Sequence, residues 1–77
     1  MAGLPQKLGA NVRAARKERG WTQEELSARS KLAVVQISRI ERGKREIRLG
    51  TLIRLLDAFE VAPDVLLDGL YKRRTRR

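Results

Sequence analysis

The amino-acid sequence predicts an all-α fold, a compact bundle of five short helices. Apolar residues recur three or four positions apart through most of the 77 residues, and no stretch alternates apolar with polar residues as a half-buried strand would. Glycine, proline and one capping box divide these periodic stretches into helix-sized lengths. The chain has room for one small domain, and 42% of its residues are hydrophobic, which suffices for a minimal helical core.

Start and stop signals bound the first two helices. The first is predicted over Pro5–Arg19, because its apolar residues keep helical spacing and Gly20 stands where a C-terminal cap belongs. The second is predicted over Gln23–Ser30. Its start is marked by Thr22 and Glu25, because each side chain can bind the backbone amide of the other residue in a capping box.

Three further helices follow a tight turn at residues 31–33. The third is predicted over Val34–Arg42, with Gly43 as its stop signal. The fifth begins at Pro63, because proline is well placed at the first position of a helix and disfavoured inside one. The fourth lies between them and is expected to bury one apolar stripe, made of Leu49, Leu52, Ile53, Leu56 and Phe59.

The net charge of +9 is unevenly distributed along the chain. Residues 29–54 carry eight basic and two acidic side chains, whereas residues 55–71 carry four acidic and no basic ones. Residues 72–77 add five basic side chains and are predicted to be a disordered tail behind a single domain over residues 1–71. A positive side beside an acidic side indicates a protein that binds a polyanion with one face.

The missing residue types argue against an enzyme and against a bound metal or cofactor. The chain has no cysteine and no histidine, and therefore no thiol nucleophile, no imidazole base and neither of the commonest transition-metal ligands. Its apolar runs, such as residues 32–35, are far shorter than the roughly 20 residues that span a bilayer. We therefore expect a cytoplasmic protein without a membrane partner.

Two short helices joined by a three-residue turn, inside this basic segment, have the layout of a helix-turn-helix. The segments Gln23–Leu26 and Ile37–Lys44 resemble the phage repressor and Cro type of helix-turn-helix, the xenobiotic-response-element class, which includes the controller proteins of restriction-modification systems. The resemblance covers residues 8–70 and implies a lambda-repressor-like DNA-binding fold. Lys31 stands at the family's turn glycine and Ala33 at its capping serine or threonine, so we expect a left-handed Lys31 and a third helix without a side-chain cap.

The third helix is predicted to read base edges in the major groove. A helix docked by its N-terminal end presents one stripe to the bases, here Ala33, Val34, Val35, Ser38 and Arg39. Arg39 can bond both acceptors of a guanine, and the valines can contact thymine methyl groups. The alternatives are that the valines belong to the core and that Arg39 is solvated or contacts only a phosphate.

Four residues are expected to bind DNA phosphates: Gln23, Lys44, Arg45 and Arg48. Gln23 lies in the first turn of its helix, where free amides and the helix dipole attract an anion, and the family uses this position for a backbone contact. The three cations follow the third helix and can reach flanking phosphates. The alternatives are an ordinary capping-region glutamine and solvated cations.

An ion pair between Arg16 and Glu41 is predicted to be structural. Glu41 falls on the inward side of the third helix, and a buried carboxylate needs a partner. The resemblance implies that this partner is Arg16 of the first helix. The alternative is a glutamate on the surface.

A homodimer on double-stranded DNA completes the prediction, because one recognition helix reads only a few base pairs. The last helix carries more apolar surface than it can bury alone, which predicts a dimer interface at Leu66, Leu67, Leu70 and Tyr71. No small-molecule effector is expected in a chain with room for one domain. The alternative is a monomer whose last helix folds wholly onto the first and fourth helices.

These residues favour an autoregulatory transcriptional regulator that binds a palindromic operator, either a restriction-modification controller or a Cro-like repressor. One alternative is a helix-turn-helix interaction module, or an antitoxin-like autoregulator with a protein partner. Another is a non-specific binder of RNA or anionic surfaces that acts through the basic tail.

Overall fold

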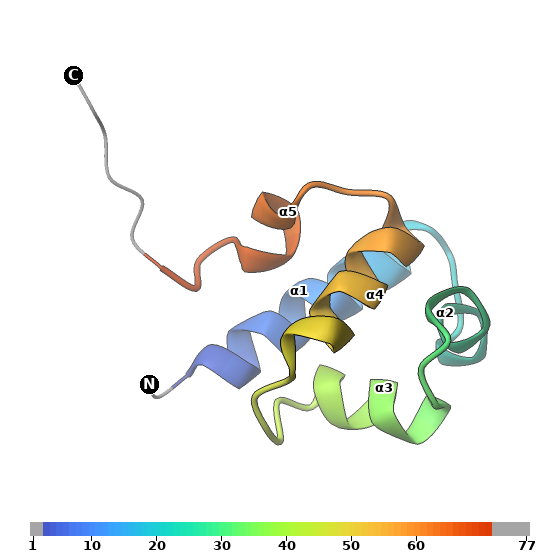
Figure 1. The fold of residues 1–77 in the computed structure, drawn as a ribbon, viewed down its shortest axis with the longest axis horizontal. Coiled ribbons are helices and arrows are strands. Elements are labelled where there is room, and N and C mark those ends of the chain that lie inside the picture. Colours follow the sequence, from blue (N-terminus) through green and yellow to red (C-terminus); the bar gives the residue numbers. More distant parts are fainter. Residues whose placement is uncertain (1–2, 72–77) are drawn as a thin grey trace.

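The computed structural model describes residues 3–71, and the predicted disordered tail at residues 72–77 lies outside this range. As predicted, the described residues contain helices and no strand (Figure 1). The long first helix crosses the molecule and packs against the third, fourth and fifth, while the second packs against the third and fourth. The five helices are α1 (Leu4–Glu18), α2 (Gln23–Ser30), α3 (Val34–Glu41), α4 (Leu49–Phe59) and α5 (Pro63–Leu67).

The start of α2 and the turn to α3 follow the sequence signals. Thr22 and Glu25 form the predicted capping box, with the Thr22 hydroxyl accepting from the Glu25 amide at 3.0 Å. Lys31 takes the expected left-handed conformation at φ 65°, which costs a non-glycine residue on the order of 1 kcal/mol. Two serine hydroxyls stabilise this turn, because Ser27 donates to the Leu32 carbonyl and Ser30 accepts from the Leu32 amide.

The buried face of α4 differs from the predicted stripe. Leu55 is fully buried with Leu56 and Phe59, whereas Leu49 is 73% exposed and Ile53 is 47% exposed. The helix is apolar on two sides, so its hydrophobic pattern alone does not select the inward face. Packing against α1 and α2 selects the side centred on Leu55 and Phe59, and Ile53 then lies roughly a third of a turn away from it.

The last helix packs onto α1 and buries a residue predicted to face a partner. Leu66 has no exposed surface, so its place in the predicted dimer interface is wrong. Asn11 of α1 fixes this arrangement, because its side-chain amide donates to the carbonyls of Leu66 and Asp68 at 2.8 Å each. The helix ends at Leu67, which leaves Leu70 and Tyr71 in the segment that follows.

An aromatic cluster that the sequence analysis did not predict ties the loop after α1 to the end of α4. Trp21 stacks on Phe59, with ring centroids 5.7 Å apart and planes 7° from parallel. The Arg29 guanidinium carbon lies 4.2 Å from the centroid of the Trp21 ring, within cation–π range. Arg19 donates to the Phe59 carbonyl at 3.0 Å.

Candidate nucleic-acid interface

Helix α3 has one buried side and one exposed side. Ile37 and Ile40 are buried against the core, whereas Val35 is 57% exposed. Of the other residues predicted to read bases, Ala33 and Arg39 are exposed, and Val34 and Ser38 are half-buried. The five residues therefore reach the surface, and Val35 is not a core residue.

The N-terminal end of α3 is open, as the sequence led us to expect. Ala33 is its N-cap residue and provides no side-chain hydrogen bond. The amides of the first turn therefore have no capping side chain. Such amides are donors for a polar group that approaches the end of the helix.

A cleft of about 200 Å³ lies between α3 and the start of α4 and gathers three predicted DNA contacts. Arg39 of α3, Arg45 of the connecting loop and Arg48 at the N-cap of α4 all line it. Lys44 does not line this cleft but is exposed immediately before Arg45. Three guanidinium groups around one cleft, with the single carboxylate of Glu46, favour binding of an anion.

Gln36 is a polar residue of this surface that the sequence analysis missed. It is exposed and lines the same cleft as Arg39, one helical turn before it in α3. Its spacing of three residues from Arg39 could have identified it, because residues three apart share one face of a helix. Its amide can donate to and accept from a base or a phosphate.

The predicted partners Arg16 and Glu41 meet between α1 and α3. Arg16 Nε donates to Glu41 Oε2 at 2.7 Å, and Arg16 Nη2 donates to Oε1 at 3.0 Å. The arginine side chain is 11% exposed and the glutamate side chain 5%. Hydrogen bonding to Glu41 raises the pKa of the Arg16 guanidinium, so the guanidinium stays charged across the whole physiological range.

Gln23 is attached to this ion pair. Its side-chain Nε2 donates to Glu41 Oε1 at 3.1 Å, and the residue is half-buried at the first position of α2. The sequence predicts a phosphate contact at Gln23 but gives no indication of this bond. One of the two amide hydrogens of Gln23 is thus used within the protein, and the other remains available.

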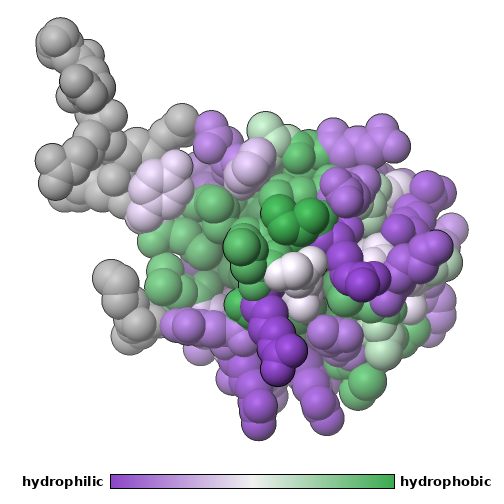
Figure 2. Space-filling model, in the orientation of Figure 1, coloured by the Kyte–Doolittle hydropathy of each residue, from purple (hydrophilic) through white to green (hydrophobic). Residues whose placement is uncertain are grey.

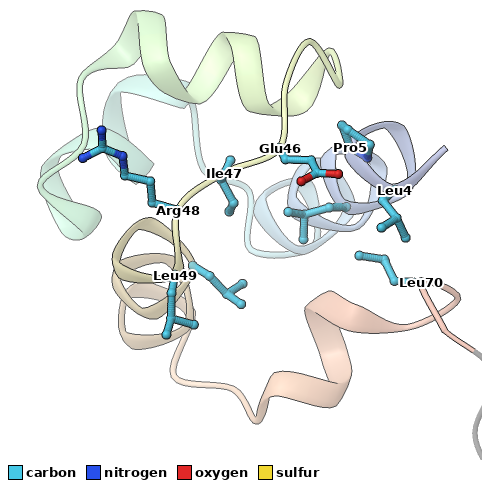
Figure 3. A pocket seen from close by; sticks show the side chains of 9 residues that line it. Leu4, Pro5, Glu46, Ile47, Arg48, Leu49 and Leu70 are labelled. Atoms are coloured by element: carbon cyan, nitrogen blue, oxygen red, sulfur yellow. The ribbon is translucent and has the colours of Figure 1, made fainter. Parts of the chain in front are cut away.

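A separate apolar surface covers the front of α4 and continues beside it (Figure 2). It includes a groove of about 280 Å³ between the start of α1, the loop before α4 and Leu70 (Figure 3). Leu49 forms one edge of this groove and is the most exposed large apolar residue in the described chain. Of the interface predicted on the last helix, Leu70 lines the groove, Leu67 is half-buried and Tyr71 is 53% exposed.

Two features are absent from residues 3–71. None of the described helices has the length and hydrophobicity needed to cross a membrane. Within the same range, no cluster of acidic residues is arranged to hold a metal ion.

Comparison with known proteins places these features in a family. A model of the helix-turn-helix family matches residues 12–66, which include α2, the turn and α3. The HTH-type transcriptional regulator y4dJ of Sinorhizobium fredii is 40% identical over 55 residues, which cover 71% of this chain and 71% of that protein. A second regulator from the same organism, y4dL, is 41% identical over 74 residues, and the chain spans 38% of its length.

A solved structure shares the whole arrangement of helices. The crystal structure of the restriction-modification controller protein C.AhdI from Aeromonas hydrophila matches with a TM-score of 0.78 and 32% sequence identity. The match covers 86% of this chain and 98% of that one. The similarity therefore extends from the two central helices to the helices that support them.

Proposed function

The chain belongs to the helix-turn-helix family of DNA-binding transcriptional regulators, and we propose that it binds a specific operator as a homodimer with α3 in the major groove. We propose further that it regulates its own gene, as a controller or a Cro-like repressor does, and that it acts by occupying DNA rather than by catalysis. The observation that carries the proposal is the exposed side of α3, with Val35 and Arg39 in the open and three guanidinium groups around the adjacent cleft. Base-reading and phosphate-binding groups thus occupy one continuous surface.

The test of DNA binding starts from a random pool of duplexes. Selection of bound sequences should yield a palindromic consensus, with half-sites about one helical turn apart. The selected duplex should bind at least about a thousandfold more tightly than random DNA at physiological salt. A steep salt dependence without that preference would instead favour a non-specific polyanion binder, and no DNA binding would favour a protein-interaction module.

Arg39 is expected to determine one base pair in each half-site. The Arg39→Ala variant should bind the selected operator less tightly by about 1 to 3 kcal/mol and lose its preference at that position, because the bidentate contact with guanine is gone. Competition binding with operators changed at single positions measures both effects. Arg13→Ala removes the same charge from the exposed side of α1 and serves as the control. An equal loss on random DNA would mean that Arg39 contacts only a phosphate.

The apolar surface of α4 is the better candidate for the dimer interface, because Leu66 is buried within one chain. Leu49 projects beside the groove lined by Leu8, Leu52 and Leu70, and such a projection and groove can complement each other across a twofold axis. The carboxylate of Glu46 lies at the edge of the groove, whereas the guanidinium of Arg48 points away from it (Figure 3), so the groove has an apolar centre with a charged group at its rim. We propose that this surface holds two copies together.

Substitution of Ile53 is expected to weaken the dimer. Ile53 is exposed one helical turn after Leu49, on the same side of α4. Ile53→Asp therefore places a charge beside the proposed interface and should raise the dissociation constant of the dimer at least about tenfold, which shifts the protein to a monomer at micromolar concentration. Val65→Asp is a matched control, because Val65 is equally exposed at 47% but lies on α5. Sedimentation velocity measures the oligomeric state of both variants. If only Val65→Asp dissociates the dimer, the interface lies on the last helix and not on α4. If the wild-type protein is a monomer, the proposed dimer is wrong.

A further inference from the structure

We infer that Glu41 is a positioning residue that holds the side-chain amide of Gln23 ready for a DNA phosphate, an inference that rests on the proposed function. The ion pair with Arg16 is then more than a link between two helices. It also orders a side chain at the edge of the DNA-binding surface.

The hydrogen bonds around Glu41 leave its carboxylate little freedom. Arg16 binds both of its oxygens, and a third bond from Arg16 Nη1 to the Trp21 carbonyl, 2.8 Å long, fixes the guanidinium in turn. Gln23 Nε2 donates to the same Oε1 that accepts from Arg16 Nη2. The amide of Gln23 is therefore bonded to a group that is held from two helices and a loop.

Order at Gln23 matters because an amide has two opposite ends. If the side chain were free, it could present either its carbonyl oxygen, which a phosphate repels, or its N–H groups, which a phosphate attracts. The bond to Glu41 selects the nitrogen end and leaves its second hydrogen for another acceptor. The adjacent start of α2 adds backbone amides, because the Thr22 hydroxyl caps only the amide of Glu25.

The charge of the pair explains why a carboxylate can serve in this position. An unpaired Glu41 would repel the phosphate that Gln23 is meant to bind, and Glu24 and Glu25 already place negative charge in the first turn of α2. Arg16, at 2.7 Å, balances the charge of Glu41. The Glu41 carboxylate can thus accept the bond from Gln23 without adding to the repulsion of a DNA phosphate.

Two uncharged replacements of the pair separate the acceptor from the charge. Arg16→Met with Glu41→Gln removes the ion pair but keeps an oxygen that Gln23 can bind, whereas Arg16→Met with Glu41→Leu removes that oxygen as well. The probe is a random duplex of about 20 base pairs at low salt, because a phosphate contact does not depend on sequence. The variant with Leu at position 41 should bind about five- to tenfold more weakly than the variant with Gln, the loss of one hydrogen bond to phosphate.

The same comparison in a Gln23→Ala background gives a readout that a purely structural role would not change. There the two replacements should bind equally, because the side chain that Glu41 positions is absent. Thermal melts establish that every variant is folded at the temperature of the binding measurement. Equal binding of the two replacements with Gln23 present, or a difference that persists without it, would overturn the inference. If the wild-type protein binds no duplex at all, the proposed function itself fails.

Discussion

The Glu41→Ala variant is expected to unfold with a free energy about 3 kcal/mol lower than that of the wild-type protein. The substitution leaves Arg16, whose side chain is 11% exposed, as an unpaired cation between α1 and α3. It also removes the acceptor of the Gln23 side chain, so both α1 and α2 lose a side-chain bond to α3. A domain of this size has a stability of only about 5 to 10 kcal/mol, so the effect is a large part of the total.

Urea denaturation followed by circular dichroism measures this loss, and the uncharged double variant is its control. Arg16→Met with Glu41→Leu removes both charges and replaces them with apolar groups, so it should be far closer to the wild type in stability than Glu41→Ala alone. An unchanged denaturation midpoint for Glu41→Ala would show that the pair contributes nothing to stability, despite its geometry.

The parts of the fold that depend on local signals could be predicted from the sequence. The second helix begins and ends where its capping box and the following turn place it. The left-handed Lys31 and the uncapped Ala33 were also expected, because the family resemblance places Lys31 at a turn glycine and because an alanine side chain has no acceptor to cap a helix. The exposed side of α3 follows from its single amphipathic pattern, since only one side carries Ile37 and Ile40.

The parts that depend on tertiary packing could not be predicted. Helix α4 is apolar on two sides, so the choice of Leu55 over Ile53 as a core residue is made by α1 and α2. Leu66 is buried because Asn11 holds the end of α5 against α1, a contact that joins residues 55 positions apart. The bond from Gln23 to Glu41 likewise depends on how α2 packs against α3, and the spacing of residues along the chain does not predict it.

Gly9 is another residue whose role depends on tertiary packing, and its substitution is the second change expected to have a large effect on stability. Alanine is favoured over glycine inside a helix by about 1 kcal/mol, so the sequence alone would predict that Gly9→Ala stabilises α1. In the structure, a Cβ atom at Gly9 would lie 2.2 Å from the carbonyl oxygen of Ile40 and 2.8 Å from that of Glu41. Both obstacles are backbone atoms, and no side-chain rotation can move them away.

Gly9→Ala is therefore expected to destabilise the protein by about 3 kcal/mol, because α3 must move off α1 to admit one methyl group. Gly50→Ala is the matched control, since a Cβ atom at Gly50 meets nothing within 4 Å and should leave stability unchanged or raise it by up to about 1 kcal/mol. Urea denaturation of the two variants measures the contrast. Because the shift displaces the end of α3 that carries Glu41, Gly9→Ala should also weaken DNA binding under conditions where the protein remains folded. A Gly9→Ala protein as stable as the wild type would mean that α1 and α3 do not approach so closely at this crossing.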